Sequence, residues 1–96
     1  MPVIAYAPRA LADLTRLVDF LAESDPAAAG ETVELIVSAV DTLRSHPLIG
    51  RPAESGCREL VISRGRSGYL ALYSYDGGRD RVLVLCVRHQ REAGYV

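Results

Sequence analysis

The sequence predicts a two-layer α+β domain, in which an N-terminal strand and a helical hairpin pack on an antiparallel three-strand meander (β-α-α-β-β-β). Three observations predict this class: paired helical patterns in residues 8–46, strand patterns in residues 58–89, and an unbroken apolar run at Val82–Val87. An apolar run of this length is typical of a central strand covered on both faces. The 96 residues are expected to form a single domain, residues 1–96.

The first helical pattern follows a short apolar segment, Val3–Ala7, which predicts a strand. Pro8 suits the first turn of a helix. The apolar stripe of this helix, which is expected to end near Ser24, contains Leu11, Leu14, Val18 and Leu21 at helical spacing, widened by Leu17 and Phe20.

The second helical pattern starts at Asp25-Pro26, an N-cap acceptor followed by a proline that suits the first helical position. It ends by His46, because Pro47 disfavours helical geometry in the residue before it. Its apolar stripe is Val33, Ile36, Val37, Val40 and Leu43. An aspartate at Leu14 or Val37 is therefore expected to abolish folding, since a buried unpaired carboxylate costs several kcal/mol.

The second half of the chain alternates strand patterns with turn residues. A loop at residues 47–56, rich in proline and glycine, precedes strands predicted at Arg58–Ser63, Tyr69–Tyr75 and Arg81–His89. In the middle strand, Tyr69, Ala71, Tyr73 and Tyr75 are expected on one face, with Leu70 and Leu72 on the other. Short turns at residues 65–68 and 76–80 make the three strands an antiparallel meander.

Charge is distributed unevenly along a chain whose net charge is −1. Residues 1–50 carry three arginines against seven acidic residues (−4), and residues 51–96 carry eight arginines against five (+3). All eleven basic residues are arginine, which suits bidentate contacts to carboxylate or phosphate. Genomic composition bias explains the absence of lysine equally well.

Several site classes are not expected. Cys57 and Cys86 lie far apart without metal-ligand spacing, so free cytoplasmic thiols are favoured over a disulfide. No clustered histidine completes a zinc site, and we expect neither a metal nor a cofactor. No apolar stretch approaches the ~20 residues of a membrane span, and the N-terminus lacks a signal-peptide pattern. We therefore expect a cytoplasmic protein without a membrane partner.

The order of elements and several local stretches resemble the RelE/ParE toxin superfamily. The matching stretches are Ala-Pro-Arg-Ala-Leu-Ala-Asp-Leu at 7–14, His-Pro-Leu-Ile-Gly-Arg-Pro at 46–52, Arg-Glu-Leu at 58–60, Gly68-Tyr69, Tyr73-Ser74-Tyr75, and Val82–Arg91 with its Arg-His-Gln-Arg end. No single stretch is specific, but their order covers nearly the whole chain. The resemblance implies the toxin half of a bacterial type II toxin–antitoxin pair, neutralised by a cognate antitoxin protein.

The superfamily divides by target: RelE-like members cleave messenger RNA on the ribosome, and ParE-like members poison DNA gyrase. In a nuclease, His89 could act as general acid or base and Arg88 could stabilise developing negative charge. The nuclease reading would draw on Arg58, Arg88, His89 and the tail residue Tyr95. The alternative for Arg88 is a strand-end ion pair, for example with Glu59, beside a solvated His89.

Further contact residues for a target or an antitoxin are expected on the meander. Tyr69 and Tyr73 could form a stacking platform for bases, although cross-strand packing beneath the helices is favoured. Arg64 and Arg66 flank a turn and could contact a nucleic acid backbone or an acidic antitoxin, and a solvated turn explains them equally well. The full set of expected target- or antitoxin-binding residues is Arg58, Arg64, Arg66, Tyr69, Tyr73, Arg88, His89 and Arg91.

Composition favours the ParE-like branch. A protein that docks among ribosomal RNA usually shows a strongly basic balance, whereas this chain has a pI near 6.1. The expected function is therefore a toxin that acts on DNA gyrase. A ribosome-dependent messenger RNA nuclease and a non-toxic antitoxin-binding module are the alternatives, so whether the chain is an enzyme stays open.

Overall fold

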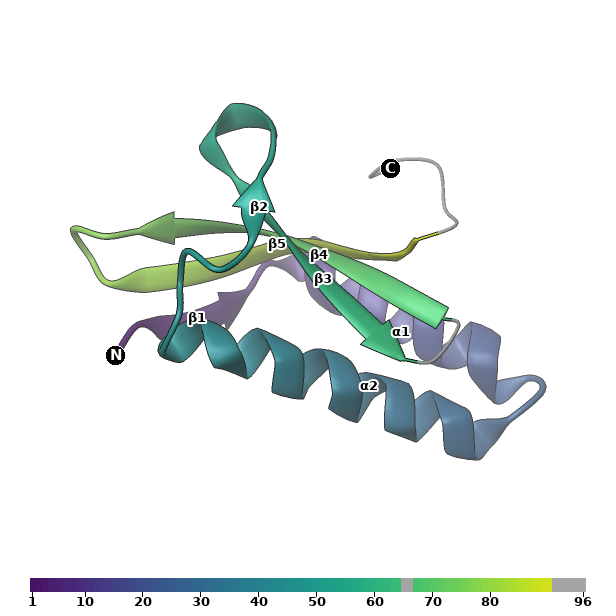
Figure 1. Ribbon diagram of the computed structural model, residues 1–96. Helices are drawn as coiled ribbons and strands as arrows, with labels where there is room; N and C mark the ends of the chain where they lie inside the picture. The colour runs from purple at the N-terminus through teal and green to yellow at the C-terminus, as the bar shows by residue number, and fades with distance from the viewer. Residues whose placement is uncertain (65–66, 91–96) are drawn as a thin grey trace.

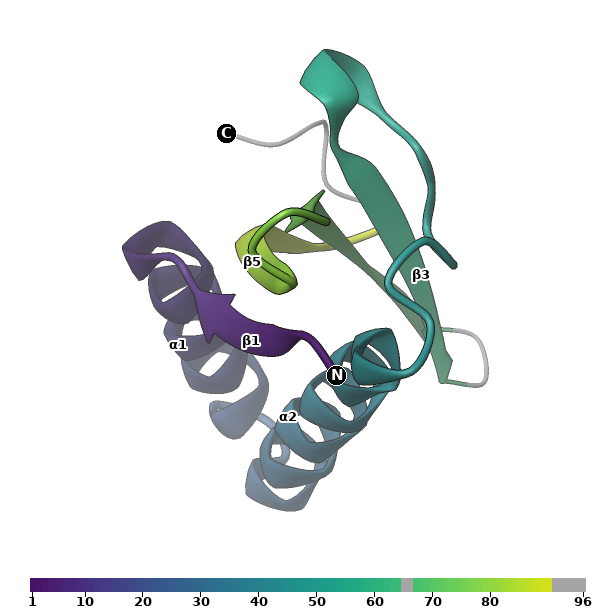
Figure 2. The same cartoon turned by 90° about the vertical axis from the view of Figure 1, so that its left-hand side faces the viewer.

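The computed structural model describes residues 1–64 and 67–90 and confirms the predicted α+β class. The elements are β1 (Val3–Tyr6), α1 (Pro8–Ala22), α2 (Pro26–Asp41), η1 (Thr42–Arg44), β2 (Arg51–Pro52), η2 (Glu54–Gly56), β3 (Arg58–Arg64), β4 (Ser67–Asp76) and β5 (Arg81–His89). Helices α1 and α2 lie side by side against one face of the sheet, and the loop between β2 and β3 projects on the other side (Figures 1 and 2).

The two helices begin where the sequence predicts. Pro8 opens α1, and the Asp25 carboxylate caps α2 by accepting a hydrogen bond from Ala28 N at 3.2 Å. After Asp41, the chain tightens into the 3₁₀ turn η1 before Pro47. Within the described residues, neither helix combines the length and apolar character that crossing a bilayer requires.

The sheet has five strands in the order β1-β5-β4-β3-β2. Strands β3, β4 and β5 form the predicted antiparallel meander, and β1 pairs in parallel with β5 from Val3↔Arg81 to Tyr6↔Val84. One strand was not predicted: Arg51–Pro52 pairs with Glu59 and Arg58 inside the expected loop. A two-residue strand carries too little periodicity to be predicted from sequence.

A β-bulge in β5 decides which side chains face the helices. Leu72 of β4 pairs with Cys86 and Tyr73 pairs with Val84, so Leu85 is the extra residue. Before the bulge, Val82 and Val84 lie on the helix face; after it, Val87 and His89 take that face. The bulge therefore reverses the alternation just before the polar end of β5.

The core fills the space between the helices and the sheet, and it corrects part of the predicted helix faces. Its members are Ala10, Leu17, Ile36, Val40, Leu43, Leu60, Ile62, Tyr69, Ala71, Tyr73, Val82, Val84 and Val87. Leu14 packs against this cluster as expected, but Leu11, Phe20 and Val37 are 53%, 71% and 44% exposed. Small residues at Ala10, Ala29 and Thr32 take buried helix positions instead.

Candidate functional site

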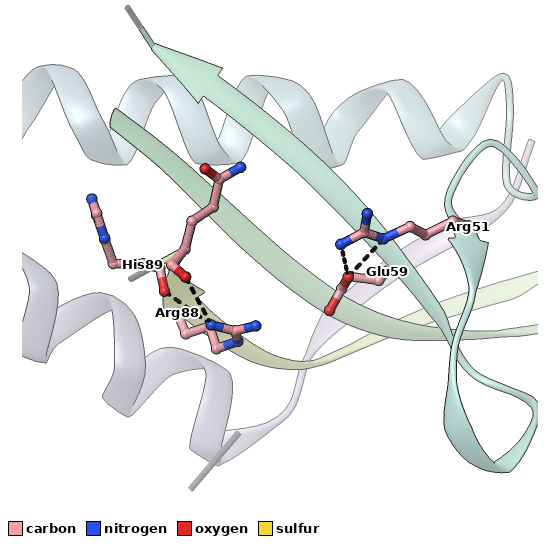
Figure 3. Close-up of polar contacts among 5 residues, drawn as sticks. Arg51, Glu59, Arg88 and His89 are labelled. Atoms are coloured by element: carbon pink, nitrogen blue, oxygen red, sulfur yellow. Dashed lines mark hydrogen bonds and ion pairs between the residues drawn. The ribbon is translucent and has the colours of Figure 1, made fainter. Parts of the chain in front are cut away.

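The polar end of β5 presents Arg88 and His89 on opposite faces of the sheet (Figure 3). His89 pairs with Tyr69 in the sheet register, on the helix face. Its ring meets the Tyr69 ring edge to face, with centroids 5.3 Å apart and planes at 89°. His89 is thus half-buried against an aromatic ring and not the solvated side chain that one expectation described.

Arg88 lies on the face away from the helices and folds back over the end of its own strand. Its Nη1 donates hydrogen bonds to the carbonyls of His89 at 3.2 Å and Gln90 at 3.4 Å (Figure 3). Gln90 N in turn donates to Gly68 O at 2.9 Å, and the Gln90 side chain lies 2.2 Å from where a Cβ at Gly68 would stand. The Gly68-Tyr69 stretch is therefore explained by close packing beneath Gln90.

Glu59 belongs to a different contact from the expected one. Its Oε1 accepts a hydrogen bond from Arg51 Nε at 2.8 Å, and the two side chains form an ion pair (Figure 3). Glu59 pairs with Arg51 instead of Arg88 because β2 places Arg51 directly opposite Glu59 in the register. The short strand that the sequence did not predict thus determines the partner of Glu59.

Arg58 and Tyr73 hold the loop that follows η1. The Tyr73 hydroxyl donates to Pro47 O at 2.8 Å and accepts from Gly50 N at 2.9 Å. Arg58 Nη1 donates to Gly50 O at 2.8 Å and Leu48 O at 3.2 Å. Residues that the sequence suggested for catalysis or target binding therefore hold backbone carbonyls in place.

Tyr69 and Tyr73 of β4 are core residues. Tyr73 is 0% exposed and Tyr69 is 4% exposed, so neither ring can stack with a base without unpacking the core. The stacking expectation is corrected for these two residues, and the favoured packing interpretation describes them. Burial raises the pKa of the Tyr73 hydroxyl above its ordinary value of 10, so this hydroxyl stays protonated near neutral pH.

The remaining expected contact residues are placed only in part. Arg64 is the last residue of β3. Arg66, Arg91 and Tyr95 lie outside the described residues. Within residues 1–64 and 67–90, no group of three or more His, Cys, Asp or Glu side chains could hold a metal ion. Both cysteines are free thiols, and Cys86 is buried.

Two structural residues escaped prediction from sequence. Asp13 of α1 accepts a hydrogen bond from Val87 N of β5 at 2.9 Å. Gly50 is buried, and a Cβ at this position would lie 2.6 Å from the Tyr73 hydroxyl. The only sequence signals were an aspartate on a helix and a glycine in a loop, which are common and unspecific.

Comparisons with known proteins agree with the fold. The family model described as ParE toxin of type II toxin–antitoxin system, parDE, matches residues 4–94. Toxin RelE3 of Caulobacter vibrioides is 35% identical over 92 residues, which cover 96% of this chain and 98% of RelE3. Toxin RelE1 of the same organism is 38% identical over 79 residues, covering 82% of this chain and 85% of RelE1.

Two solved structures contain chains that are similar to this chain over almost its whole length. The chromosomal ParDE toxin–antitoxin system of P. aeruginosa contains a chain with a TM-score of 0.79 and 26% identity, covering 93% of this chain and 96% of that one. The RelBE2 toxin–antitoxin complex of Mycobacterium tuberculosis contains a chain with a TM-score of 0.62 and 26% identity, covering 94% and 100%. The match along almost the whole length shows that this chain belongs to the ParE toxin family, within the RelE/ParE superfamily of type II toxin–antitoxin toxins.

Proposed function

We propose that this toxin is neutralised in the cytoplasm by a cognate antitoxin and acts on a protein target, DNA gyrase, rather than as a ribosome-dependent nuclease. The antitoxin partner is supported by the similar solved structures, which are toxin–antitoxin complexes. An antitoxin segment that folds on binding can cover a large surface on a small domain. Arg88 of β5, and Arg91 three positions further along the sequence, are the proposed contacts for such a segment.

The distance between the candidate catalytic groups is the observation that favours DNA gyrase over the ribosome as the target. Arg58 is level with Tyr73 of β4, and His89 is level with Tyr69, four residues along the same strand. At about 3.3 Å per residue, these levels lie roughly 13 Å apart. Cleavage requires the acid, the base and the charge stabiliser within reach of one phosphate. Arg58, Arg88 and His89 do not form such a cluster.

The contacts that these three side chains make also argue against a nuclease site. Arg58 is bonded to two loop carbonyls, His89 packs on Tyr69, and Arg88 projects from the opposite face. The pI near 6.1 adds that the chain lacks the strong positive charge that favours docking among ribosomal RNA.

A direct comparison of targets tests the proposal. The purified toxin is incubated with DNA gyrase and relaxed plasmid in one arm, and with programmed ribosomes in the other. We expect loss of supercoiling and intact messenger RNA. Codon-spaced cuts that disappear in Arg88→Ala but persist in Arg79→Ala, with gyrase unaffected, would replace gyrase by the ribosome. Arg79 is the matched control because it is an exposed arginine on the turn between β4 and β5.

The nuclease is the second candidate, and the names of the Caulobacter relatives, RelE3 and RelE1, favour it. A third candidate is a non-toxic module that retains antitoxin binding. Growth assays separate this third candidate: expression of the chain alone would leave growth normal, while the antitoxin encoded beside it would still bind tightly in a pull-down.

A further inference from the structure

The loop between η1 and β2 carries two exposed aliphatic side chains, Leu48 and Ile49, which we call the loop tip. They are 57% and 59% exposed, although both are large and apolar. The tip lies at the end of the molecule where α2 ends, whereas β5 ends at the opposite end (Figure 1). The loop is bonded to Tyr73 of β4, whereas His89 is level with Tyr69, four residues or roughly 13 Å along that strand.

Side chains from the sheet fix the loop tip in position. Tyr73 bonds to Pro47 and Gly50, and Arg58 bonds to Leu48 and Gly50, at distances from 2.8 to 3.2 Å. Tyr73 is fully buried, so this anchor belongs to the core itself. A contact surface that is already ordered loses less conformational entropy when a partner binds.

The same hydrogen bonds lower the free-energy cost of removing water from the loop backbone. Residues 47–50 have seven backbone polar groups, three N–H and four C=O, because Pro47 has no N–H. Five of these are bonded within the chain: the carbonyls of Pro47, Leu48 and Gly50, and the amides of Ile49 and Gly50. A partner that covers the tip therefore buries few backbone polar groups without a hydrogen bond. Such unpaired buried groups would oppose binding.

The tip itself is apolar, and the arginines beside it are bonded within the chain. A shallow hollow of about 430 Å³ is lined by His46, Pro47, Leu48 and Ile49. Beside it, Arg44 forms an ion pair with Asp41 at 2.6 Å, and Arg51 pairs with Glu59. Arg58 bonds to the carbonyls of Leu48 and Gly50. A surface that complements the two aliphatic side chains of the tip is therefore itself apolar and uncharged.

We propose that the loop tip is the docking point for an uncharged apolar patch on the folded protein target of the toxin. This inference rests on the proposed function and specifies where the target binds. A rigid tip of two projecting side chains suits a folded partner with a matching pocket. An antitoxin segment that folds on binding needs an extended track instead. Leu48 and Ile49 are thus specificity-determining residues, and Arg58 and Tyr73 are positioning residues.

The test compares the double variant Leu48→Ser/Ile49→Ser with the control Val37→Ser/Val61→Ser, whose residues are 44% exposed elsewhere on the surface. For each protein we measure growth arrest on graded expression, affinity for the antitoxin encoded beside it, and the melting temperature. We expect the tip variant to need roughly tenfold more protein for arrest, because tenfold corresponds to about 1.4 kcal/mol of binding. Antitoxin affinity and melting temperature stay within experimental error of the wild type, and the control arrests growth normally.

A conservative double variant, Leu48→Met/Ile49→Val, is expected to restore arrest because it keeps the apolar surface. Undiminished arrest by the serine variant would overturn the docking point while leaving the toxin assignment intact. Parallel loss of antitoxin affinity at an unchanged melting temperature would assign the tip to the antitoxin and overturn the target. Failure of the wild type itself to arrest growth would overturn the proposed function, and this inference with it.

Discussion

Asp13 Oδ2 accepts a hydrogen bond of 2.9 Å from the amide of Val87, which lies 74 positions further along the chain. This hydrogen bond occupies the edge of β5 just beyond the point where the pairing with β1 ends. Strand β1 pairs with β5 only as far as Tyr6↔Val84, and Ala7 N donates to Val84 O. Asp13 then satisfies the next amide on that side of β5, so the helix takes over where the strand ends.

Replacing Asp13 with alanine is expected to lower the free energy of unfolding by about 1–3 kcal/mol, because the buried Val87 amide loses its partner. Asp13→Asn keeps an acceptor oxygen and should cost less. Asp19→Ala, an exposed position on the same helix, is the control. Urea denaturation followed by circular dichroism measures all three. Equal stability of Asp13→Ala and Asp19→Ala would show that the contact contributes nothing.

Neighbouring residues of α2 should respond oppositely to the same charge. Ile36→Asp is expected to abolish folding, because Ile36 is 0% exposed and an isolated buried carboxylate costs several kcal/mol. Val37→Asp should fold cooperatively, since Val37 is 44% exposed. Thermal unfolding separates the two variants. A cooperative transition in Ile36→Asp would contradict the helix orientation.

Removing the Tyr73 hydroxyl should weaken the anchor of the loop tip. Tyr73→Phe leaves Pro47 O and Gly50 N without their bonds, with an expected loss of about 2 kcal/mol. Tyr75→Phe is the matched control, because the Tyr75 hydroxyl bonds to the exposed carboxylate of Asp80. Chemical denaturation at pH 7 measures both. A smaller loss in Tyr73→Phe than in Tyr75→Phe would refute the anchoring role.

Alkaline pH gives a second readout for Tyr73. Burial raises the pKa of the folded tyrosine above the ordinary value of 10, so its contribution is complete below pH 10. That contribution is lost as the pH rises through the raised value, because the unfolded state ionises first. The stability of Tyr73→Phe should therefore fall less steeply above pH 10 than that of the wild type. Parallel curves in a pH series of denaturation midpoints would contradict the burial of this hydroxyl.

The two thiols should differ in reactivity. Burial is the main factor that raises the pKa of Cys86, and its side chain is almost fully covered, whereas Cys57 is half-buried. Iodoacetamide at pH 8 should therefore modify Cys57 faster, by roughly tenfold or more, because the thiolate is the nucleophile. Timed quenching with peptide mass spectrometry gives both rates. Faster labelling of Cys86 in the folded protein would contradict its environment.

Much of the fold could be predicted because the signals are local. Pro8 and Asp25-Pro26 mark helix starts, and Val82–Val87 marks the central strand. Which of Arg88 and His89 faces the helices could not be predicted, since the bulge at Leu85 shifts the alternation and leaves no mark in an apolar run. Burial also did not follow hydrophobicity on the helices: Ala10 is buried, whereas the larger and more apolar Val37 is exposed. Small residues occupy buried helix positions because they allow close packing.

The candidate site was predicted less well than the fold. Arg58 and Tyr73 were singled out for their chemistry, and their side chains hold the backbone of a distant loop. Such roles depend on contacts between residues 8 to 26 positions apart, which an isolated sequence does not display. The exposed Leu48 and Ile49 belonged to a stretch noted only for its resemblance to a family loop.

The parallel pairing of β1 with β5 has a consequence for synthesis. Within this sheet, β1 is synthesised before the other strands, and its only neighbour, β5, is synthesised after them, in a register that joins Val3 to Arg81. Contacts of such long sequence separation form late, because the loop that they close is costly in entropy. A nascent chain therefore completes this sheet only after β5 has been synthesised. An antitoxin made beforehand can meet each new molecule at that moment.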